Sequence, residues 1–155
     1  MKVWRYDERK FQVGDQIEPE SGKSPQLTPE QWGAEKIIRS AQPGGKEIRE
    51  SSVYCFEERR LANLGANRTG RCLYELEIKQ EDIQHRGDLF FYDRVAKKIK
   101  SGEDPADDAC QYWNGTECPQ RPAIELLVRR AIVVAVHSVD PIVNRPTTSA
   151  DDYGL

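Results

Sequence analysis

Apolar and polar residues alternate along several short stretches of the chain, a pattern typical of β-strands with one buried face. The alternation is most regular at residues 71–79, where Cys72, Tyr74, Leu76 and Ile78 fall on one face and mostly charged residues on the other. Runs rich in β-branched and aromatic residues predict further strands at residues 2–6, 51–56, 124–128 and 131–139, and a strand or sheet edge at 88–92. Residues 11–17 also alternate, but the turn signal Gly14-Asp15 breaks the pattern, so a turn is predicted after the first strand.

Helix signals lie between these strands. Thr28, Pro29 and Gln31 supply an N-cap hydroxyl, a proline at the first helical position and a side chain that can complete a capping box, so a helix is predicted from residue 29 to the Pro-Gly-Gly stop at residues 43–45. Apolar spacing and capping residues predict further helices at residues 57–66, 93–100 and 104–113.

Six or seven short strands with three or four helices predict an α+β domain joined mostly by local β-hairpins and crossings. Residues 1–140 carry all of the apolar patterning and are predicted to form a single domain. Residues 141–155 contain two prolines and no apolar pattern, so a loose C-terminal tail is predicted there.

Composition narrows the class of protein. Of the 155 residues, 37% are hydrophobic and 32% are charged, which is polar for a folded chain but too rich in aromatic residues for full disorder. No stretch approaches the ~20 apolar residues of a membrane span, and the N-terminus lacks an apolar signal core, so we expect a cytoplasmic protein with no membrane partner.

Charge and metal-ligand residues exclude two further classes. The net charge of −3 argues against bulk electrostatic binding of nucleic acid. The charge is unevenly distributed, because residues 101–155 carry a net charge of −5 and residues 1–100 a net charge of +2. An anionic ligand is therefore expected at the N-terminal two-thirds of the chain. The four cysteines form no CxxC pair and only two histidines accompany them, so no metal site is expected and the thiols are expected to be free.

Glu125 does not fit its surroundings, because it lies inside an apolar β run. A buried carboxylate costs several kcal/mol unless it is paired, at an edge or facing a cleft. It is therefore a candidate catalytic residue, and the alternative is a solvent-facing position on a half-exposed strand.

Arg5 is the second misfit, because a guanidinium between Trp4 and Tyr6 suits a phosphate or carboxylate partner. A surface salt bridge is the alternative. Ser51 and Ser52 precede Tyr54 at the head of a strand, where hydroxyls can bind a ligand or simply cap backbone groups.

Two features could contact a large acceptor. The basic helix that contains Lys97 and Lys98 could guide an acidic acceptor such as RNA or DNA, although a solvated helix face explains such a run equally simply. Tyr112 and Trp113 could stack on a base, or close the end of a helix onto the core.

Three of these segments occur in an order that resembles the mono-ADP-ribosyltransferase superfamily. They are Val3-Trp4-Arg5, Ser51-Ser52-Val53-Tyr54 and Ile124-Glu125-Leu126-Leu127-Val128. The last piece is similar to the glutamate segment of DarT-type nucleic-acid ADP-ribosyltransferases. Residues 11–17 and 53–56 also resemble the small rifampin-type enzymes. The resemblance spans residues 3 to about 139 and implies an ADP-ribosyltransferase-like split β-sheet core with flanking short helices.

The resemblance implies that NAD is the co-substrate and that no metal is needed. Glu125 would stabilise the positive charge that develops on the ribose, Arg5 would hold the phosphates, Ser51 or Ser52 would position Glu125 or the ribose, and Tyr54 would stack on nicotinamide. Tyr112, Trp113, Lys97 and Lys98 would meet the acceptor.

The chain also departs from the resembled families. Ala123 stands where the arginine-modifying members place a second Glu or a Gln, which argues against a protein arginine as acceptor. The rifampin-type enzymes carry a His on the first strand and an acidic residue elsewhere, a part that Asp88 or Asp93 could play.

The function expected from these features is ADP-ribosyl transfer from NAD to a nucleic acid or protein acceptor, as in a toxin or defence effector that an inhibitory partner could hold inactive. An NAD glycohydrolase and a non-catalytic α+β binding module are the alternatives.

Overall fold

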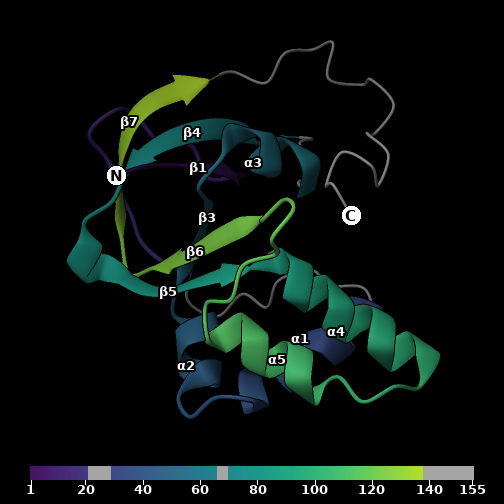
Figure 1. The fold of residues 1–155 in the computed structure, drawn as a ribbon. Helices are drawn as coiled ribbons and strands as arrows, with labels where there is room; N and C mark the ends of the chain where they lie inside the picture. Colours follow the sequence, from purple (N-terminus) through teal and green to yellow (C-terminus); the bar gives the residue numbers. More distant parts are fainter. Residues whose placement is uncertain (21–28, 66–69, 138–155) are drawn as a thin grey trace.

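The computed structural model describes residues 1–20, 29–65 and 70–137 of the chain. In this part, one open antiparallel sheet of seven strands packs against helices, so the predicted α+β class is confirmed (Figure 1). Residue 28, the end of the last predicted strand at 138–139 and the predicted tail at 141–155 lie outside the described residues. The strands are β1 (Lys2–Asp7), β2 (Gln16–Ile17), β3 (Val53–Phe56), β4 (Cys72–Glu77), β5 (Ile83–Asp88), β6 (Ile124–Val128) and β7 (Ala131–His137), and they lie in the order β2-β7-β4-β1-β3-β6-β5.

Neighbouring strands come from distant parts of the sequence, so the predicted local hairpins are wrong. β1 pairs with β4, and β3 pairs with β6. β6 and β7 are consecutive in the chain but do not pair with each other. A two-residue hairpin favours positive φ angles at its central residues, and neither Arg129 nor Arg130 adopts one.

The sheet narrows at its centre, where β1 and β3 pair at a single position, Trp4 with Phe56. We call this the β1–β3 joint. It connects the group β2-β7-β4-β1 to the group β3-β6-β5, and Figure 1 shows β4 and β7 above β5 and β6 with β3 between them. The implied split sheet is therefore not found as two separate sheets, because the strands remain continuous through this one residue pair.

Five α-helices occur in the described ranges: α1 (Pro29–Ser40), α2 (Gly45–Glu50), α3 (Arg59–Gly65), α4 (Leu89–Ser101) and α5 (Ala106–Trp113). The strand or edge predicted at 88–92 is wrong, because Asp88 ends β5 and caps α4 through a 2.9 Å hydrogen bond from the Phe90 amide to its Oδ1. The cap and the amphipathic residues after it outweigh the β-propensity of the aromatic run. α2 was not predicted at all.

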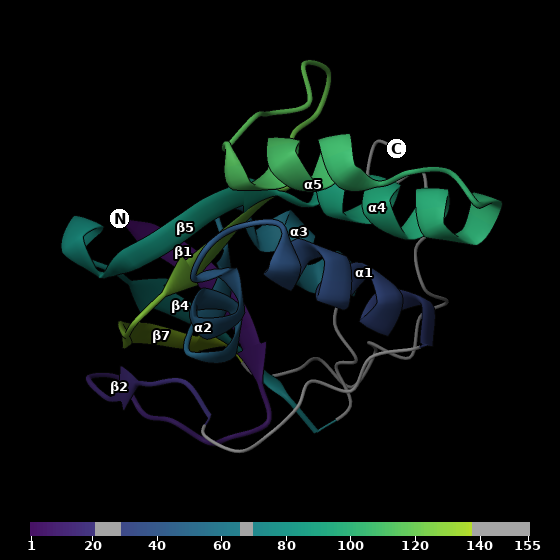
Figure 2. The ribbon, with the colours of Figure 1, turned by 90° about the horizontal axis from the view of Figure 1, so that it is seen from below.

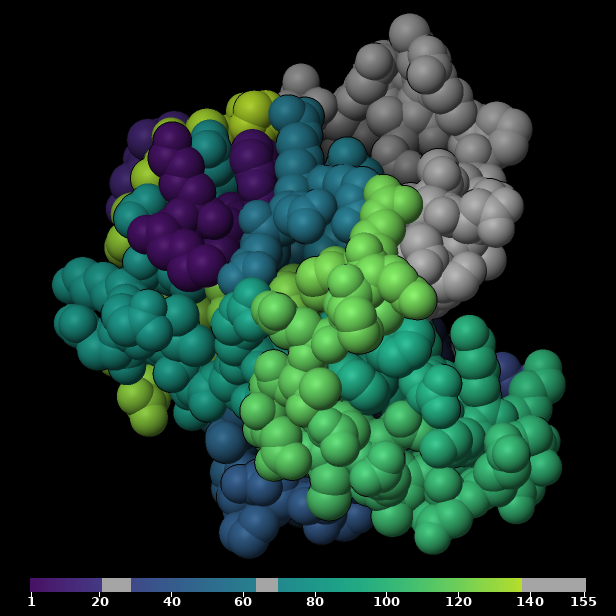
Figure 3. Space-filling view, in the orientation of Figure 1, coloured from purple at the N-terminus to yellow at the C-terminus, as the bar shows by residue number. Residues whose placement is uncertain are grey.

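The helices form a layer on one face of the sheet. α1 and α4 lie side by side in this layer (Figure 2), and α4 and α5 form the green lower part of the molecule in Figure 3. In the described part of the chain, no helix is long and apolar enough to cross a membrane.

Two apolar clusters stabilise these layers. One lies on the sheet face away from α2 and α5 and consists of Val3, Ile17, Val53, Cys55, Tyr74, Leu76, Ile78, Leu126, Val128, Ala131 and Val133. The other joins α1, α4 and α5 through Ala34, Ile38, Val95, Ala109 and Tyr112. Each fully buried Leu, Ile or Val contributes about 1.5–3 kcal/mol to the stability of the fold. The two clusters therefore stabilise the sheet and the helices on either side of the polar residues described below.

Candidate functional site

Glu125 lies on β6 beside the β1–β3 joint. It pairs with Phe56 of β3, which in turn pairs with Trp4 of β1, and with Gly87 of β5. Directly paired residues share a sheet face, so its side chain points toward the helices. Only 6% of that side chain is exposed, and all of β6 is buried. The alternative of a solvent-facing Glu125 is therefore wrong.

Two side chains bind the same oxygen of Glu125. Arg49 of α2 donates from Nη1 to Oε2 at 3.1 Å, and the Tyr112 hydroxyl of α5 donates to Oε2 at 2.9 Å. Arg49 Nη1 also donates to the Tyr112 hydroxyl oxygen at 2.8 Å, which closes a triangle. No residue in ranges 1–20, 29–65 and 70–137 donates a hydrogen bond to the other oxygen, Oε1. Oε1 is thus the atom that retains capacity for a ligand.

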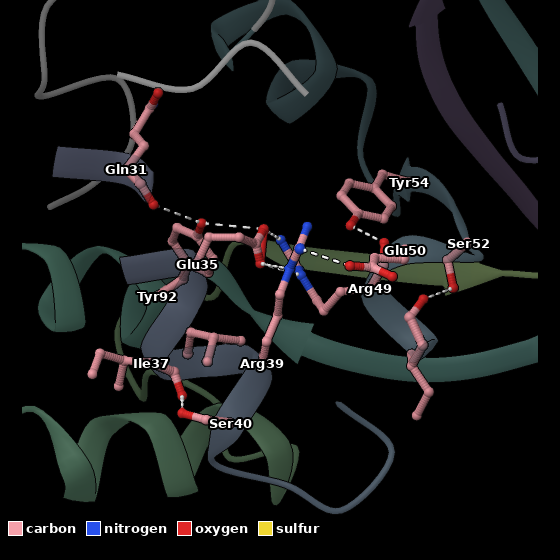
Figure 4. Close-up of polar contacts among 12 residues, drawn as sticks. Gln31, Glu35, Ile37, Arg39, Ser40, Arg49, Glu50, Ser52, Tyr54 and Tyr92 are labelled. Carbon is pink, nitrogen blue, oxygen red and sulfur yellow. Dashed lines mark hydrogen bonds and ion pairs between the residues drawn. The ribbon is translucent and has the colours of Figure 1, made fainter. Parts of the chain in front are cut away.

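A second buried carboxylate, Glu35 of α1, holds the other side of the same guanidinium. Arg49 donates to it from Nη2 at 2.6 Å and from Nε at 2.9 Å (Figure 4). Arg39 approaches Glu35 at 3.4 Å and pairs with Glu50 at 3.1 Å. Three carboxylates and two guanidinium groups leave this group of five, which we call the Arg49 cluster, with a net charge of −1.

Aromatic rings enclose the Arg49 guanidinium. Its central carbon lies 4.7 Å from the ring centre of Tyr54, 5.3 Å from that of Tyr92 and 5.8 Å from that of Tyr112. Burial opposes the charged form of Arg49, but the charge of Glu125 and the hydrogen bonds to Glu35 hold its pKa well above the ordinary value. Burial raises the pKa of Tyr54 to about 12, although Arg49 opposes this shift. Burial, and then Glu125, also raise the pKa of Tyr112, so its hydroxyl remains protonated as a donor at neutral pH.

Gly87 allows Tyr112 to reach this position. A Cβ atom at residue 87 would lie 2.6 Å from Cε2 of Tyr112 and 2.8 Å from Nε2 of His85. Such distances do not occur between packed atoms, so only glycine lets α5 lie this close to β5. The glycine opposite Glu125 is therefore part of what builds the site.

The structure separates the two aspartates that the rifampin-type resemblance left open. Asp88 is fully buried and accepts hydrogen bonds from the backbone amides of Phe90, Cys118 and Ala123, so it organises the backbone. Asp93, on α4, is half-buried. Burial raises its pKa to about 6; Lys97 opposes this shift, and Glu125 and Asp88 add to it.

Arg5 does not join Glu125. Trp4 shares the face of Phe56 and Glu125 by register, so the neighbouring Arg5 points to the opposite face of the sheet. Its guanidinium binds the Asp7 carboxylate at 2.9 Å and the Tyr54 carbonyl oxygen at 2.9 Å. Arg5 therefore links β1 to β3 across the joint.

The predicted serines terminate a helix. Ser51 Oγ donates to the Glu47 carbonyl oxygen and Ser52 Oγ to the Ile48 carbonyl oxygen, each at 2.6 Å. Both hydroxyls satisfy the last carbonyls of α2, as the backbone-capping alternative predicts. Neither has a described contact with Glu125.

The predicted acceptor-binding residues divide in the same way. Tyr112 is fully buried in the site, so the predicted stacking of its ring on a base is wrong. The Trp113 indole donates to the Ile38 carbonyl oxygen at 2.7 Å and closes α5 onto α1, as the alternative predicted. Lys98 pairs with Asp108 at 2.6 Å, and Lys97 opposes the burial that raises the pKa of Asp93. The basic helix thus has acidic partners close by.

The sequence-based reasoning missed Arg49 and Glu35. A signal for Glu35 exists, because it lies one residue from Ala34 and three from Ile38, both buried on the same helix. A charged residue on that apolar stripe indicates a buried partner. Arg49 lies in a helix of six residues, which is too short to show an apolar period.

Among the residues that the structure describes, no group of three or more His, Cys, Asp or Glu side chains could hold a metal ion. Compared with protein-family models, curated proteins and solved structures, the chain matches none of them.

Proposed function

We propose that this chain is an NAD-dependent ADP-ribosyltransferase in which Glu125 stabilises the positive charge that develops on the ribose. The observation that carries the proposal is the Oε1 atom of Glu125. It belongs to a buried carboxylate beside the β1–β3 joint and has no donor in the described part of the chain. The resemblance of the Glu125 segment to ADP-ribosyltransferases supports the same function, whereas Arg5 and the two serines, which belong to the same resemblance, do not contact Glu125.

The chemistry needs negative charge and few proton transfers. The bond between the ribose C1′ and the nicotinamide nitrogen breaks with both electrons going to nicotinamide, which leaves as a neutral molecule. An oxocarbenium-like charge then develops on the ribose, and a fixed carboxylate stabilises it most where water is excluded. The Arg49 cluster has a net charge of −1 and is mostly buried, which suits this role.

The structure changes the roles that the resemblance implies for other residues. Arg5 faces away from Glu125, so the proposal gives it no phosphate contact. Ser51 and Ser52 cap α2 and contribute only to the position of Arg49. Tyr54 packs on the Arg49 guanidinium, so its ring supports the cluster. Tyr112, which was predicted to contact the acceptor, instead donates to Glu125 and takes the orienting role expected of Ser51 or Ser52.

The test is nicotinamide release from NAD by the wild-type protein and by Glu125→Gln. This substitution keeps the size of the side chain and removes its charge, so we expect kcat to fall by about 100- to 1000-fold, the usual effect of losing one electrostatic stabiliser. Glu57→Gln is a matched control, because Glu57 pairs with Arg86 at the surface, 2.9 Å away. Equal turnover by Glu125→Gln and wild type, or no turnover by wild type, would contradict the proposal.

Labelled NAD separates transfer from hydrolysis. Incubation with a total cell lysate, followed by nuclease or protease treatment, shows whether the label is attached to nucleic acid or to protein. Label found only as free ADP-ribose would identify an NAD glycohydrolase. Calorimetric binding of NAD without any turnover would identify a non-catalytic binding module.

A further inference from the structure

Arg49 binds its two buried carboxylates unequally. It makes two hydrogen bonds with Glu35, at 2.6 and 2.9 Å, and one with Glu125, at 3.1 Å. The paired, parallel geometry is the stronger way for a guanidinium to bind a carboxylate. Glu35 is 1% exposed and therefore competes for Arg49 without screening by water.

This inequality matters to the charge on Glu125. One guanidinium neutralises one carboxylate, and Arg49 makes its stronger, two-bond contact with Glu35. Without Glu35, Arg49 would turn its full charge and a second N–H toward Glu125. Glu125 would then be less able to stabilise a cationic ribose, and Oε1 would gain a donor.

We propose that Glu35 is a positioning residue for the transfer reaction: it holds Arg49 so that Glu125 keeps its negative charge and its Oε1 stays free for the ribose. The inference rests on the function proposed above. Glu35 and Arg49 exchange no atoms with NAD. Nicotinamide takes the electrons of the broken bond, and the acceptor atom forms the new bond to C1′. The proton that the acceptor atom carried passes to solvent.

The geometry makes this role specific to Glu35. Glu35 and Arg49 come from different helices, α1 and α2, and meet at Glu125 on β6. Arg39 approaches Glu35 at 3.4 Å and does not contact Glu125. The ionisable groups on the helix side of the sheet around Glu125, which any pH profile must take into account, are Arg49, Glu35, Tyr54, His85, Tyr92, Asp93 and Tyr112.

The test compares the pH profiles of kcat for nicotinamide release by wild type, Glu35→Gln and the double variant Glu35→Gln/Arg49→Met. In Glu35→Gln, Glu125 is the only carboxylate left for the Arg49 guanidinium to neutralise. We therefore expect kcat to fall by about tenfold or more, because each 1.36 kcal/mol of lost transition-state stabilisation is a factor of ten. The acidic limb of the profile should move to lower pH, because a closer guanidinium favours the ionised carboxylate.

The double variant removes the cation together with Glu35. We expect the acidic limb to move above its wild-type position and the rate at alkaline pH to exceed that of Glu35→Gln. A purely structural role for Glu35 would lower the rate of both variants without these opposite shifts. Glu35→Gln leaves Arg49 paired with Glu125, whereas the double variant leaves Glu125 with only Tyr112 as a donor among the described residues, so circular dichroism must first show that both variants fold. If the double variant does not fold, Glu35→Gln decides alone: an acidic limb at lower pH supports the role, and an unchanged limb overturns it.

Glu30→Gln is the control on the same helix, because Glu30 pairs with Lys100 at the surface, 3.7 Å away, and should leave the profile unchanged. If wild type and Glu35→Gln have the same kcat and acidic limb while Glu125→Gln is inactive, the positioning role is overturned and the proposed function stands. If wild type releases no nicotinamide, the function fails and this inference with it.

Discussion

The Tyr112 hydroxyl should contribute measurably to stability, whatever the reaction. Tyr112→Phe keeps the ring and removes a group that accepts from Arg49 at 2.8 Å and donates to Glu125 at 2.9 Å. A hydrogen bond to a charged group contributes about 1.5–3 kcal/mol, and a buried partner left unpaired adds to the loss. Arg49 and Glu125 retain their own contact at 3.1 Å, so we expect the free energy of unfolding to fall by about 2–3 kcal/mol.

Tyr92→Phe is the matched control. The Tyr92 ring also packs on Arg49, but the contacts of its hydroxyl with described residues, Gln31 and Glu35, are both 3.5 Å long. Its removal should therefore cost no more than about 0.5 kcal/mol. Urea denaturation followed by circular dichroism at pH 7 compares the two variants, and Tyr112→Phe should also lower Tm by about 4–12 °C. Losses within about 0.5 kcal/mol of each other would refute the account of Tyr112 as the orienting donor.

Three further outcomes are expected. Gly87→Ala should lower the free energy of unfolding by about 1–3 kcal/mol and displace Tyr112, detectable by urea denaturation and by the aromatic NMR signals, since its Cβ would lie 2.6 Å from that ring. The pKa of Asp93 is raised from 3.8 to about 6, so the folded state binds its proton more tightly: this stabilisation is complete below about pH 4 and is lost as pH rises through about 6. Asp93→Asn should abolish that pH dependence and stabilise the fold at pH 7 by about 1–2 kcal/mol; an unchanged pH profile of stability would contradict the shift. Among the described cysteines, exposed Cys110 should react with a thiol reagent well before buried Cys55, whose pKa burial raises to about 12; mass spectrometry of timed samples would show the order.

The sequence alone revealed much of the strand pattern. β6 begins and ends where its apolar run predicts, and the alternation of Tyr74, Leu76 and Ile78 is confirmed by their place in one buried cluster. Local pattern could not reveal which strands pair, because every neighbouring pair except β5 with β6 joins segments that are not consecutive strands. The prediction of local hairpins failed for this reason.

The candidate site was only partly predictable for the same reason. Glu125 was found because a carboxylate in an apolar run is costly, and that cost is local to the sequence. Which side of β1 faces Glu125 depends on the Trp4 and Phe56 pair, so the sequence did not show that Arg5 points away. The role of Arg49 could be recognised only from the structure, which shows that α2 packs against β6.

The β1–β3 joint leaves the ion network of Glu125 and strand β1 in different halves of the fold. Glu35, Arg49, Tyr112 and Glu125 all belong to the helices and to β6, on one side of the joint. The connection to β1 includes one backbone pairing, the hydrogen bond from Arg5 to the Tyr54 carbonyl, and the packing of α3 against both β1 and β3. The hydrogen bonds of Glu125 therefore come from α2 and α5, so a substitution that leaves β1 folded should leave this network assembled.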